Sequence, residues 1–265
     1  METRNEKMRS GPNLLKWSNI VAFAAVVLVN GVAGGTTIIG GRNTADVSNT
    51  YSTLITPAGY TFAIWGVIYV LLGVYVVYQA LPRSKSQAFQ QRVGWLFVLG
   101  CLFNVLWIFA WQNEFMSLSV LLIFLLLASL ILIYLRLDVG RSKVDRAQRL
   151  AVHLPFSVYL GWITIASIAD VAAALVSANW NGFGISPETW AIGIILIALL
   201  IASLVAYIRK DIAYELVVVW AFLGIAVNQG AFQAIQISLL ASVVVVVIVL
   251  TVSIFHGTRM SKRAR

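Results

Sequence analysis

Long apolar stretches dominate this chain, and short polar segments separate them along its whole length. A helix needs roughly 20 mostly apolar residues to cross about 30 Å of hydrocarbon. The pattern therefore predicts about eight membrane-spanning helices and no soluble domain. Only Asn228, Gln229 and Gly230 separate the last two spans. The predicted spans are Trp17–Ile39, Pro57–Ala80, Arg92–Trp111, Phe115–Leu137, Leu150–Leu175, Trp190–Ile208, Ile212–Gly230 and Ala231–Phe255.

Composition agrees with this pattern and narrows the chemistry. Of the 265 residues, 60% are hydrophobic and only 11% are charged, which is too little polar surface for a soluble globule of this size. We therefore expect an all-α fold, a polytopic transmembrane helical bundle. The only cysteine, Cys101, lies inside a span, and the chain has two histidines. With one cysteine and two histidines, we predict no metal site. No Gly-rich phosphate loop or nucleophile elbow is present, so we predict no catalytic residue and do not favour an enzyme.

The basic residues set the predicted orientation. With eight spans, every one of the 19 lysines and arginines except Arg42 falls on the same side of the membrane. Lys and Arg accumulate on the cytoplasmic side, so we expect both termini there, in the plasma membrane. The net charge of +9 is thus a topology signal and no sign of nucleic-acid binding. A cleaved signal peptide is the rival interpretation of the first span, but Ile20–Ile39 is long for one.

Several aromatic and polar residues lie deep within the spans. Trp65, Trp107, Trp162 and Trp220 are deep, whereas the other tryptophans lie at or near span ends, where interfacial anchoring explains them. Residues three or four apart share one helix face. Three such sets fall in the predicted outer half of the membrane and indicate an aromatic-walled pocket that opens outward: Trp65 with Tyr69, Asn104 with Trp107, and Trp162 with Ala166 and Asp170.

Asp170 is the main ionisable group within a span. An intramembrane carboxylate is costly and is a functional candidate, but Asp170 also lies high enough to reach interfacial water and serve only in packing. Both interpretations stay open. Arg42 could pair with Asp170 or with an anionic ligand. Gln229, Gln233 and Gln236 favour interhelical hydrogen bonds.

Three motifs resemble those of the TspO/MBR family, the tryptophan-rich sensory or translocator proteins. The run from Thr56 to Tyr69, followed by Gly73, resembles the second-helix motif of that family. Asn104-Val105-Leu106-Trp107 resembles its Asn-x-x-Trp in the third helix. Pro155 and Trp162-x-x-x-Ala166 are similar to its fifth-helix pattern. Thr56 replaces the first proline, Tyr60 stands where a loop tryptophan would be, and Asp170 replaces an asparagine.

The resemblance implies a five-helix core at residues 17–175 with an outward-opening pocket, lidded by the connection Gly40–Thr56. Residues 176–255 would then form three additional helices, between a cytoplasmic segment at 1–16 and a basic tail at 256–265. Family members bind porphyrins, so the expected ligand is hydrophobic and tetrapyrrole-like. No cofactor is firmly implied, although porphyrin or haem would be a ligand, and a homodimer stays open. The implied ligand-binding residues are Tyr60, Phe62, Trp65, Tyr69, Asn104, Trp107, Trp162, Ala166 and Asp170, with Arg42 in the lid.

Three functions follow from this resemblance. The first is a membrane receptor or sensor that binds the ligand. The second is a transporter of that ligand or of another small hydrophobic or anionic molecule, in which Asp170 would serve a gated path. The third is an enzyme that degrades a bound porphyrin, with Trp65 or Trp162 as the redox- or photo-active side chain. Binding, proton-coupled flux and light-dependent loss of the porphyrin spectrum would distinguish the three.

Overall fold

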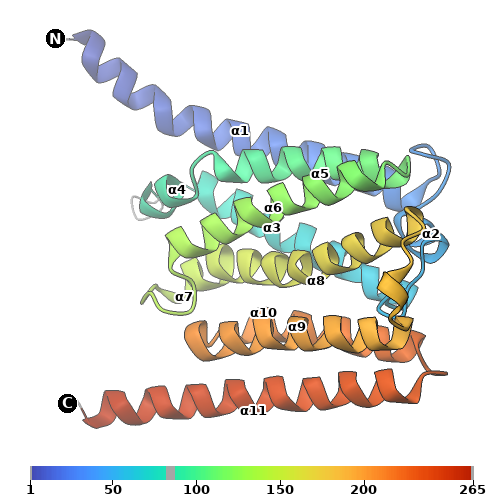
Figure 1. The fold of residues 1–265 in the computed structure, drawn as a ribbon. Coiled ribbons are helices and arrows are strands. Elements are labelled where there is room, and N and C mark those ends of the chain that lie inside the picture. The colour runs from blue at the N-terminus through green and yellow to red at the C-terminus, as the bar shows by residue number, and fades with distance from the viewer. Residues whose placement is uncertain (1, 82–86, 264–265) are drawn as a thin grey trace. The chain divides into compact units, whose positions relative to one another are not determined.

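The computed structural model describes residues 2–81 and 87–263, and every regular element in these two ranges is a helix (Figure 1). The expected all-α fold is confirmed. In chain order the elements are α1 (Glu2–Gly35), α2 (Thr44–Thr50), η1 (Gly59–Ala63), α3 (Ile64–Ala80), α4 (Gln87–Val93), α5 (Leu96–Gln112), α6 (Met116–Leu137), α7 (Arg146–Gln148), η3 (Arg149–His153), α8 (Leu154–Ser177), η4 (Gly182–Gly184), α9 (Pro187–Arg209), α10 (Ile212–Asn228) and α11 (Gln233–Arg263).

Six helical segments of the described chain are long and apolar enough to cross a membrane, so this is an integral, multi-pass membrane protein. Two further apolar helices, α5 and α10, have 17 residues each and lie where the third and seventh spans are predicted. Their length is at the lower end of what a span requires. The six long segments are Leu14–Gly35, Gly59–Ala80, Met116–Leu137, Arg146–Ser177, Pro187–Arg209 and Gln233–Phe255.

Element boundaries follow local capping chemistry. α9 begins where the Ser186 side chain accepts a hydrogen bond from the Thr189 amide, and α10 begins after Asp211, which accepts from Ala213 and Tyr214. The predicted third span starts too early, at Arg92, because Gly94 has a φ of +53° and ends the short helix α4 before α5 begins. Arg83, Lys85 and Arg265, three of the residues behind the predicted orientation, lie outside the described residues.

The chain packs into two compact units, which are described separately. Unit 1 comprises Met1–Val47, Trp65–Asp138 and Val144–Phe156. Unit 2 comprises Ser48–Ile64, Val139–Lys143 and Ser157–Arg265. These units reflect packing, and the expected division of the chain at residue 175 stays a prediction.

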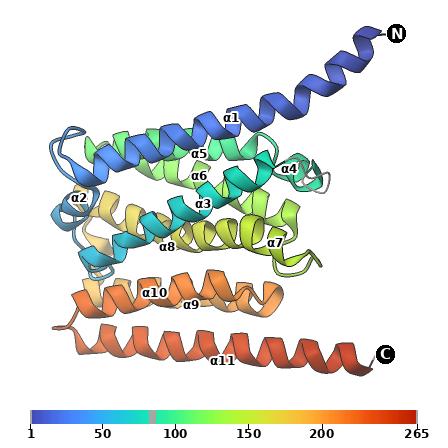
Figure 2. The same cartoon turned by 180° about the vertical axis from the view of Figure 1, so that it is seen from behind.

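Unit 1 is built around α5, which packs against both α1 and α6 (Figures 1 and 2). Gly100 faces α6, and a Cβ placed there would be in ordinary van der Waals contact with Leu126 at 3.7 Å. At one end of the unit an aromatic cluster surrounds the fully buried Tyr75, whose ring centroid lies 5.0 Å from those of Phe97 and Phe156. Small residues and interlocking aromatic rings thus hold these helices together, as bilayer packing requires.

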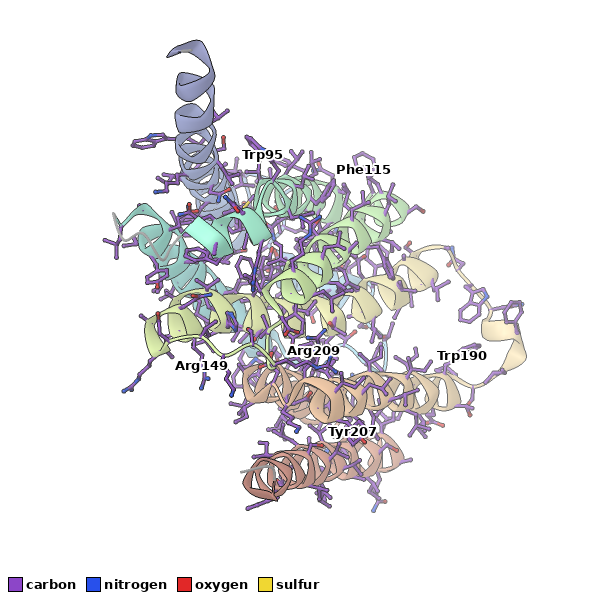
Figure 3. All side chains as sticks on the ribbon, turned by 90° about the vertical axis from the view of Figure 1, so that its left-hand side faces the viewer. Trp95, Phe115, Arg149, Trp190, Tyr207 and Arg209 are labelled. Carbon is purple, nitrogen blue, oxygen red and sulfur yellow. The ribbon has the colours of Figure 1, made fainter. Side chains whose placement is uncertain are left out.

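Unit 2 contains α9, α10 and α11 side by side, together with most of α8 (Figures 1 and 2). α9 buries a stripe of small residues, with Ala198, Ala202 and Ala206 at intervals of four. Such a stripe allows neighbouring helices to approach without a large side chain between them. Large apolar side chains instead project outward, among them Tyr207 in unit 2 and Trp95 and Phe115 in unit 1 (Figure 3). Lipid is the solvent that suits these exposed side chains.

Candidate functional site

Four aromatic rings form a continuous stack in unit 1. Trp65 and Tyr69 lie four residues apart on α3, and Trp107 and Trp111 lie four apart on α5. The ring centroids are 5.7 Å apart for Tyr69 and Trp65, 5.8 Å for Trp65 and Trp107, and 6.0 Å for Trp107 and Trp111. Successive rings are tilted by only 20°, 29° and 24°. Near-parallel rings at these distances are in stacking contact. The structure therefore brings three predicted residues, Trp65, Tyr69 and Trp107, together, and it adds Trp111.

Polar side chains fix α5, which carries half of this stack. The Asn30 Nδ2 donates to Asn104 Oδ1 at 2.7 Å, and the Asn104 side chain is fully buried. Gln112 Nε2 donates to the Ala33 carbonyl at 2.8 Å, so α1 and α5 are bonded at two levels. The indole N–H of Trp111 donates to the Thr44 carbonyl at 3.1 Å. Asn104 thus acts first as a helix-packing residue, through a partner that the sequence did not reveal.

Arg42 pairs with an acidic residue of its own unit. Its Nη1 lies 3.1 Å from Glu114 Oε1, and both side chains are partly exposed. From the sequence, Asp170 or an anionic ligand was the expected partner of Arg42. An exposed ion pair contributes little to stability, so the guanidinium can change partners at small cost.

In unit 2 the turn η1 holds two more predicted residues, each against a tryptophan. The ring of Tyr60 meets Trp220 edge-on, with centroids 5.5 Å apart and planes at 80°. Phe62 meets Trp162 in the same way at 5.9 Å and 81°. Trp162 is buried in α8, whereas Tyr60 is half exposed. The motif residue Phe62 is thus in contact with Trp162 of the predicted fifth span, within one unit.

One face of α10 holds the segment that leads into η1. Trp220, Gly224 and Asn228 lie four residues apart on this face. The Trp220 indole N–H donates to the Thr61 carbonyl at 3.0 Å, the Ala58 amide donates to the Gly224 carbonyl at 3.0 Å, and Asn228 Nδ2 donates to the Thr56 carbonyl at 3.0 Å.

Gln229 adds contacts to the Thr53 and Thr56 carbonyls. Its predicted role in interhelical bonding is therefore replaced by bonding to the connection, because the carbonyls of this irregular segment need donors. Gln236 does form an interhelical bond, to the Ala226 carbonyl at 3.3 Å.

The remaining predicted residues lie on α8. Trp162, Ala166 and Asp170 share one helix face, and Asp170 is only 2% exposed. Near Ala169 the unit contains a small hollow with a wholly apolar lining, formed mainly by isoleucines with Phe222 and Ala198. A hollow without polar groups cannot orient the polar edge of a macrocycle, so it is not a site for one.

Three residues that contact the predicted site residues could not be assigned this role from the sequence. Trp111 lies at a span end, where anchoring was the simpler interpretation, yet its spacing of four from Trp107 was a usable signal. Trp220 lies deep within its predicted span, but the sequence does not show which residue it contacts. Asn30 carried no signal that distinguishes it from any other polar residue in a span.

Among the residues that the structure describes, no group of three or more His, Cys, Asp or Glu side chains could hold a metal ion.

Comparison with known proteins gives one match. The family model described as TSPO-like protein matches residues 16–254. This range includes the ring stack of unit 1, the ring contacts of Tyr60 and Phe62 in unit 2, and the C-terminal helices. Neither a search of curated proteins nor a search of solved structures finds a match.

Proposed function

Because the chain belongs to the TSPO-like protein family, we propose that it binds a planar, hydrophobic, tetrapyrrole-like molecule against its aromatic side chains. The observation that carries this proposal is the stack of Tyr69, Trp65, Trp107 and Trp111 in unit 1. A flat macrocycle gains most from rings that already lie nearly parallel and are held in place, because little side-chain freedom is lost on binding.

Burial differs along the stack in a way that suits a ligand at one end. Trp107 and Trp111 are buried, whereas Trp65 and Tyr69 are only half-buried. The α3 end is thus the accessible part, and the α5 end serves as its rigid support. Each added ring contact contributes about 0.5–1.5 kcal/mol beyond the burial of area, which corresponds to roughly a two- to tenfold change in affinity.

Titration with protoporphyrin IX tests this proposal. Purified protein in detergent is titrated while tryptophan fluorescence is followed in wild type, Trp65→Phe and Trp107→Phe. Trp95→Phe is the matched control, since Trp95 lies in the same unit but is exposed and outside the stack. We expect saturable quenching that weakens several-fold in Trp65→Phe and stays unchanged in Trp95→Phe. Linear quenching that is equal in all variants would mean that porphyrin only partitions into the detergent, and the proposal would fail.

A transport function is the second candidate, and the burial of Asp170 favours it. A carboxyl group that is 2% exposed on a membrane helix is costly to retain without a role. Reconstituted vesicles loaded with a porphyrin should then show flux that Asp170→Asn abolishes while binding is kept. Binding without flux in the wild type would exclude transport and leave the receptor.

We also propose that both termini face the cytoplasm of a plasma-membrane protein, as the basic residues predict. The single native cysteine is buried, which gives a clean background for labelling. A membrane-impermeant maleimide applied to intact cells should label Asn181→Cys, in the connection before α9, and should leave Ser142→Cys, before α7, unlabelled. The reverse pattern would invert the topology.

A further inference from the structure

A buried carboxyl group without a hydrogen-bond donor lies near the start of α10. Glu215 is 1% exposed, and neither of its carboxyl oxygens has a hydrogen-bond partner among the residues that the structure describes. The helix around it is apolar, with Leu216, Val217 and Val218 following directly. An ionised carboxylate placed in such surroundings without a donor costs several kcal/mol, so something must neutralise it.

A second acid stands one helical turn before Glu215. Asp211 lies four residues earlier and therefore on the same helix face, and it is the charged group that acts on Glu215 electrostatically. Asp211 is itself fully used as a hydrogen-bond acceptor. Its Oδ1 caps α10 by accepting from the Ala213 and Tyr214 amides, and its Oδ2 accepts from the Ser157 hydroxyl at 2.6 Å. These three donors occupy both carboxyl oxygens of Asp211, and none of them is available to Glu215.

Tight packing keeps water away from this pair. At Gly161, on α8, a Cβ would lie 3.0 Å from the Tyr214 carbonyl oxygen and 3.2 Å from Val217, so the two helices are in backbone contact here. Tyr214 is also buried, and its phenol is hydrogen-bonded to Thr164 instead of to Glu215. The exposed residues next to the pair are Lys210 in the turn and the apolar Ile212 and Leu216 on the outer face of α10. Of these, Lys210 alone is polar, so the turn is the route to water.

No hydrogen bond joins Glu215 to a cation among the residues that the structure describes. The described side chains of α11, up to Phe255, include no charged group, and η1 contributes only Tyr60. α9 carries Glu188 at its far end and Arg209 at the near end, where Arg209 belongs to the turn between α9 and α10. The unit 2 part of α8 carries Asp170, which lies 13 residues beyond Ser157. The turn before α10 does hold basic residues, Lys210 and also Arg141, whose Nε donates to the Ile208 carbonyl at 3.2 Å. Neither is hydrogen-bonded to Glu215, whose two carboxyl oxygens have no partner among the described residues.

We propose that Asp211 and Glu215 form a proton-binding site at the start of α10, in which the two carboxyl groups together hold one proton, carried by Glu215. Two carboxyl groups this close in a dry environment retain one proton between them. The site lies one turn inside the helix, so the proton needs only the short step past Asp211 to exchange with water. This proton-binding site includes none of the stacked rings of unit 1 or the aromatic residues at η1. It does not depend on the ligand proposed above.

Modification by dicyclohexylcarbodiimide tests the proposal on the full-length protein in its membrane. This apolar reagent requires a protonated carboxyl group. The carboxyl proton moves to one carbodiimide nitrogen, the carboxyl oxygen bonds to the central carbon, and the acyl group then shifts to the other nitrogen to leave a stable N-acylurea with no leaving group. We expect one adduct on Glu215 by mass spectrometry, lost in Glu215→Gln and kept in the control Glu188→Gln, whose site is on the exposed first turn of α9.

A second variant probes the coupling of the two acids. Asp211→Asn keeps a capping side chain but removes the neighbouring charge. Because that charge favours the protonated form of Glu215, labelling in Asp211→Asn should be lost at a lower pH than in the wild type. Equal pH profiles would show that the two groups do not share the proton. Protection of Glu215 by sodium at constant pH would make the occupant a metal cation and would overturn the proposal.

Infrared difference spectroscopy decides the case in which the reagent fails to reach Glu215. A protonated carboxyl group has a carbonyl stretching band that carboxylates lack. Hydrogen–deuterium exchange should shift one such band in the wild type, and Glu215→Gln should remove it. If Glu215→Gln leaves every such band in place, Glu215 is ionised and the proposal is wrong, whatever the labelling result.

Discussion

The indole N–H of Trp220 donates to the main-chain carbonyl of Thr61 at 3.0 Å, although 159 residues separate the two in sequence. This bond ties α10 to the turn that carries Tyr60 and Phe62. Next to it, Gly224 packs directly beneath the Thr61 side chain, with no room for even a Cβ. Helix α10 is therefore a structural support for the motif that starts near Thr56, through its Trp220–Gly224–Asn228 face.

Gly224→Ala should destabilise the protein. The added methyl group would collide with the Oγ1, Cγ2 and Cβ atoms of Thr61, and overpacking of this kind costs about 1–3 kcal/mol. A lower midpoint of thermal unfolding in detergent is the expected result. Gly193→Ala is the matched control, because Gly193 also lies inside an apolar helix but has no neighbouring atom within 4 Å of the added carbon. Its midpoint should be unchanged or slightly higher.

Thr61→Ala combined with Gly224→Ala provides the rescue. Removing the Oγ1 and Cγ2 atoms leaves only the milder contact with the Thr61 Cβ, so part of the lost stability should return. If the double variant is no more stable than Gly224→Ala alone, the contact with Thr61 is not the cause of the loss.

A second pair of glycines separates backbone strain from steric collision. Gly40 and Gly41 have φ values of +66° and +75°, which other residues adopt at a cost of about 1–2 kcal/mol. At Gly40 a Cβ would also collide with the Gln112 carbonyl, whereas at Gly41 it would meet nothing. We expect Gly40→Ala to lower the unfolding midpoint clearly more than Gly41→Ala does. Equal losses would show that the connection does not pack against Gln112.

The sequence predicted the helical membrane fold well because apolar length is a local property. The boundaries that matter can be read from single residues, such as Ser186 and Asp211 as caps and the break after Asn228. The short helix α2 within the connection Gly40–Thr56 was not expected, since Thr44–Thr50 has no apolar periodicity. Its first residues instead gain support from Asn43, whose side chain accepts hydrogen bonds from the Ala45 and Asp46 amides.

The candidate site was predictable only in part, because partners across long sequence separations leave no local signal. Spacing of four placed Trp65 with Tyr69 on one face, and depth placed Trp107 at a similar level, but the stacking of these rings on one another and on Trp111 was not expected. The bonds of Asn104 to Asn30 and of Trp220 to Thr61 could not, because either side chain has many equivalent partners until the helices are packed. Glu215 did carry a local signal, because it lies inside the predicted span Ile212–Gly230, but its burial against α8 at Gly161 appears only in the packed structure.

The Asn30–Asn104 hydrogen bond should be measurable as a coupling energy. In a double-mutant cycle of Asn30→Ala and Asn104→Ala, an interhelical bond in a membrane protein contributes about 0.6 kcal/mol, and we expect a coupling of that size. The matched cycle uses Asn113→Ala, since Asn113 bonds only to the Phe109 carbonyl of its own helix. That cycle with Asn30→Ala should give no coupling. Equilibrium unfolding in mixed micelles provides the free energies, and equal coupling in both cycles would contradict the assigned contact.

Substitutions in the exposed pair Arg42–Glu114 separate a role in stability from a role in ligand binding. Because the pair is partly exposed, Arg42→Gln and Glu114→Gln should each change the free energy of unfolding by less than about 1 kcal/mol. If Arg42 meets the acidic edge of a porphyrin, Arg42→Gln weakens binding of protoporphyrin IX. Glu114→Gln then strengthens it, because the competing carboxylate is gone.

Protoporphyrin IX dimethyl ester is the control ligand for this pair, since it keeps the macrocycle and lacks the negative charges. Its affinity should be the same in wild type, Arg42→Gln and Glu114→Gln, and added salt should reduce only the effect seen with the free acid. A parallel loss for both ligands in Arg42→Gln would mean that the substitution disturbs the connection itself. The guanidinium would then act through the ion pair with Glu114 on the fold of the lid, and not on the ligand.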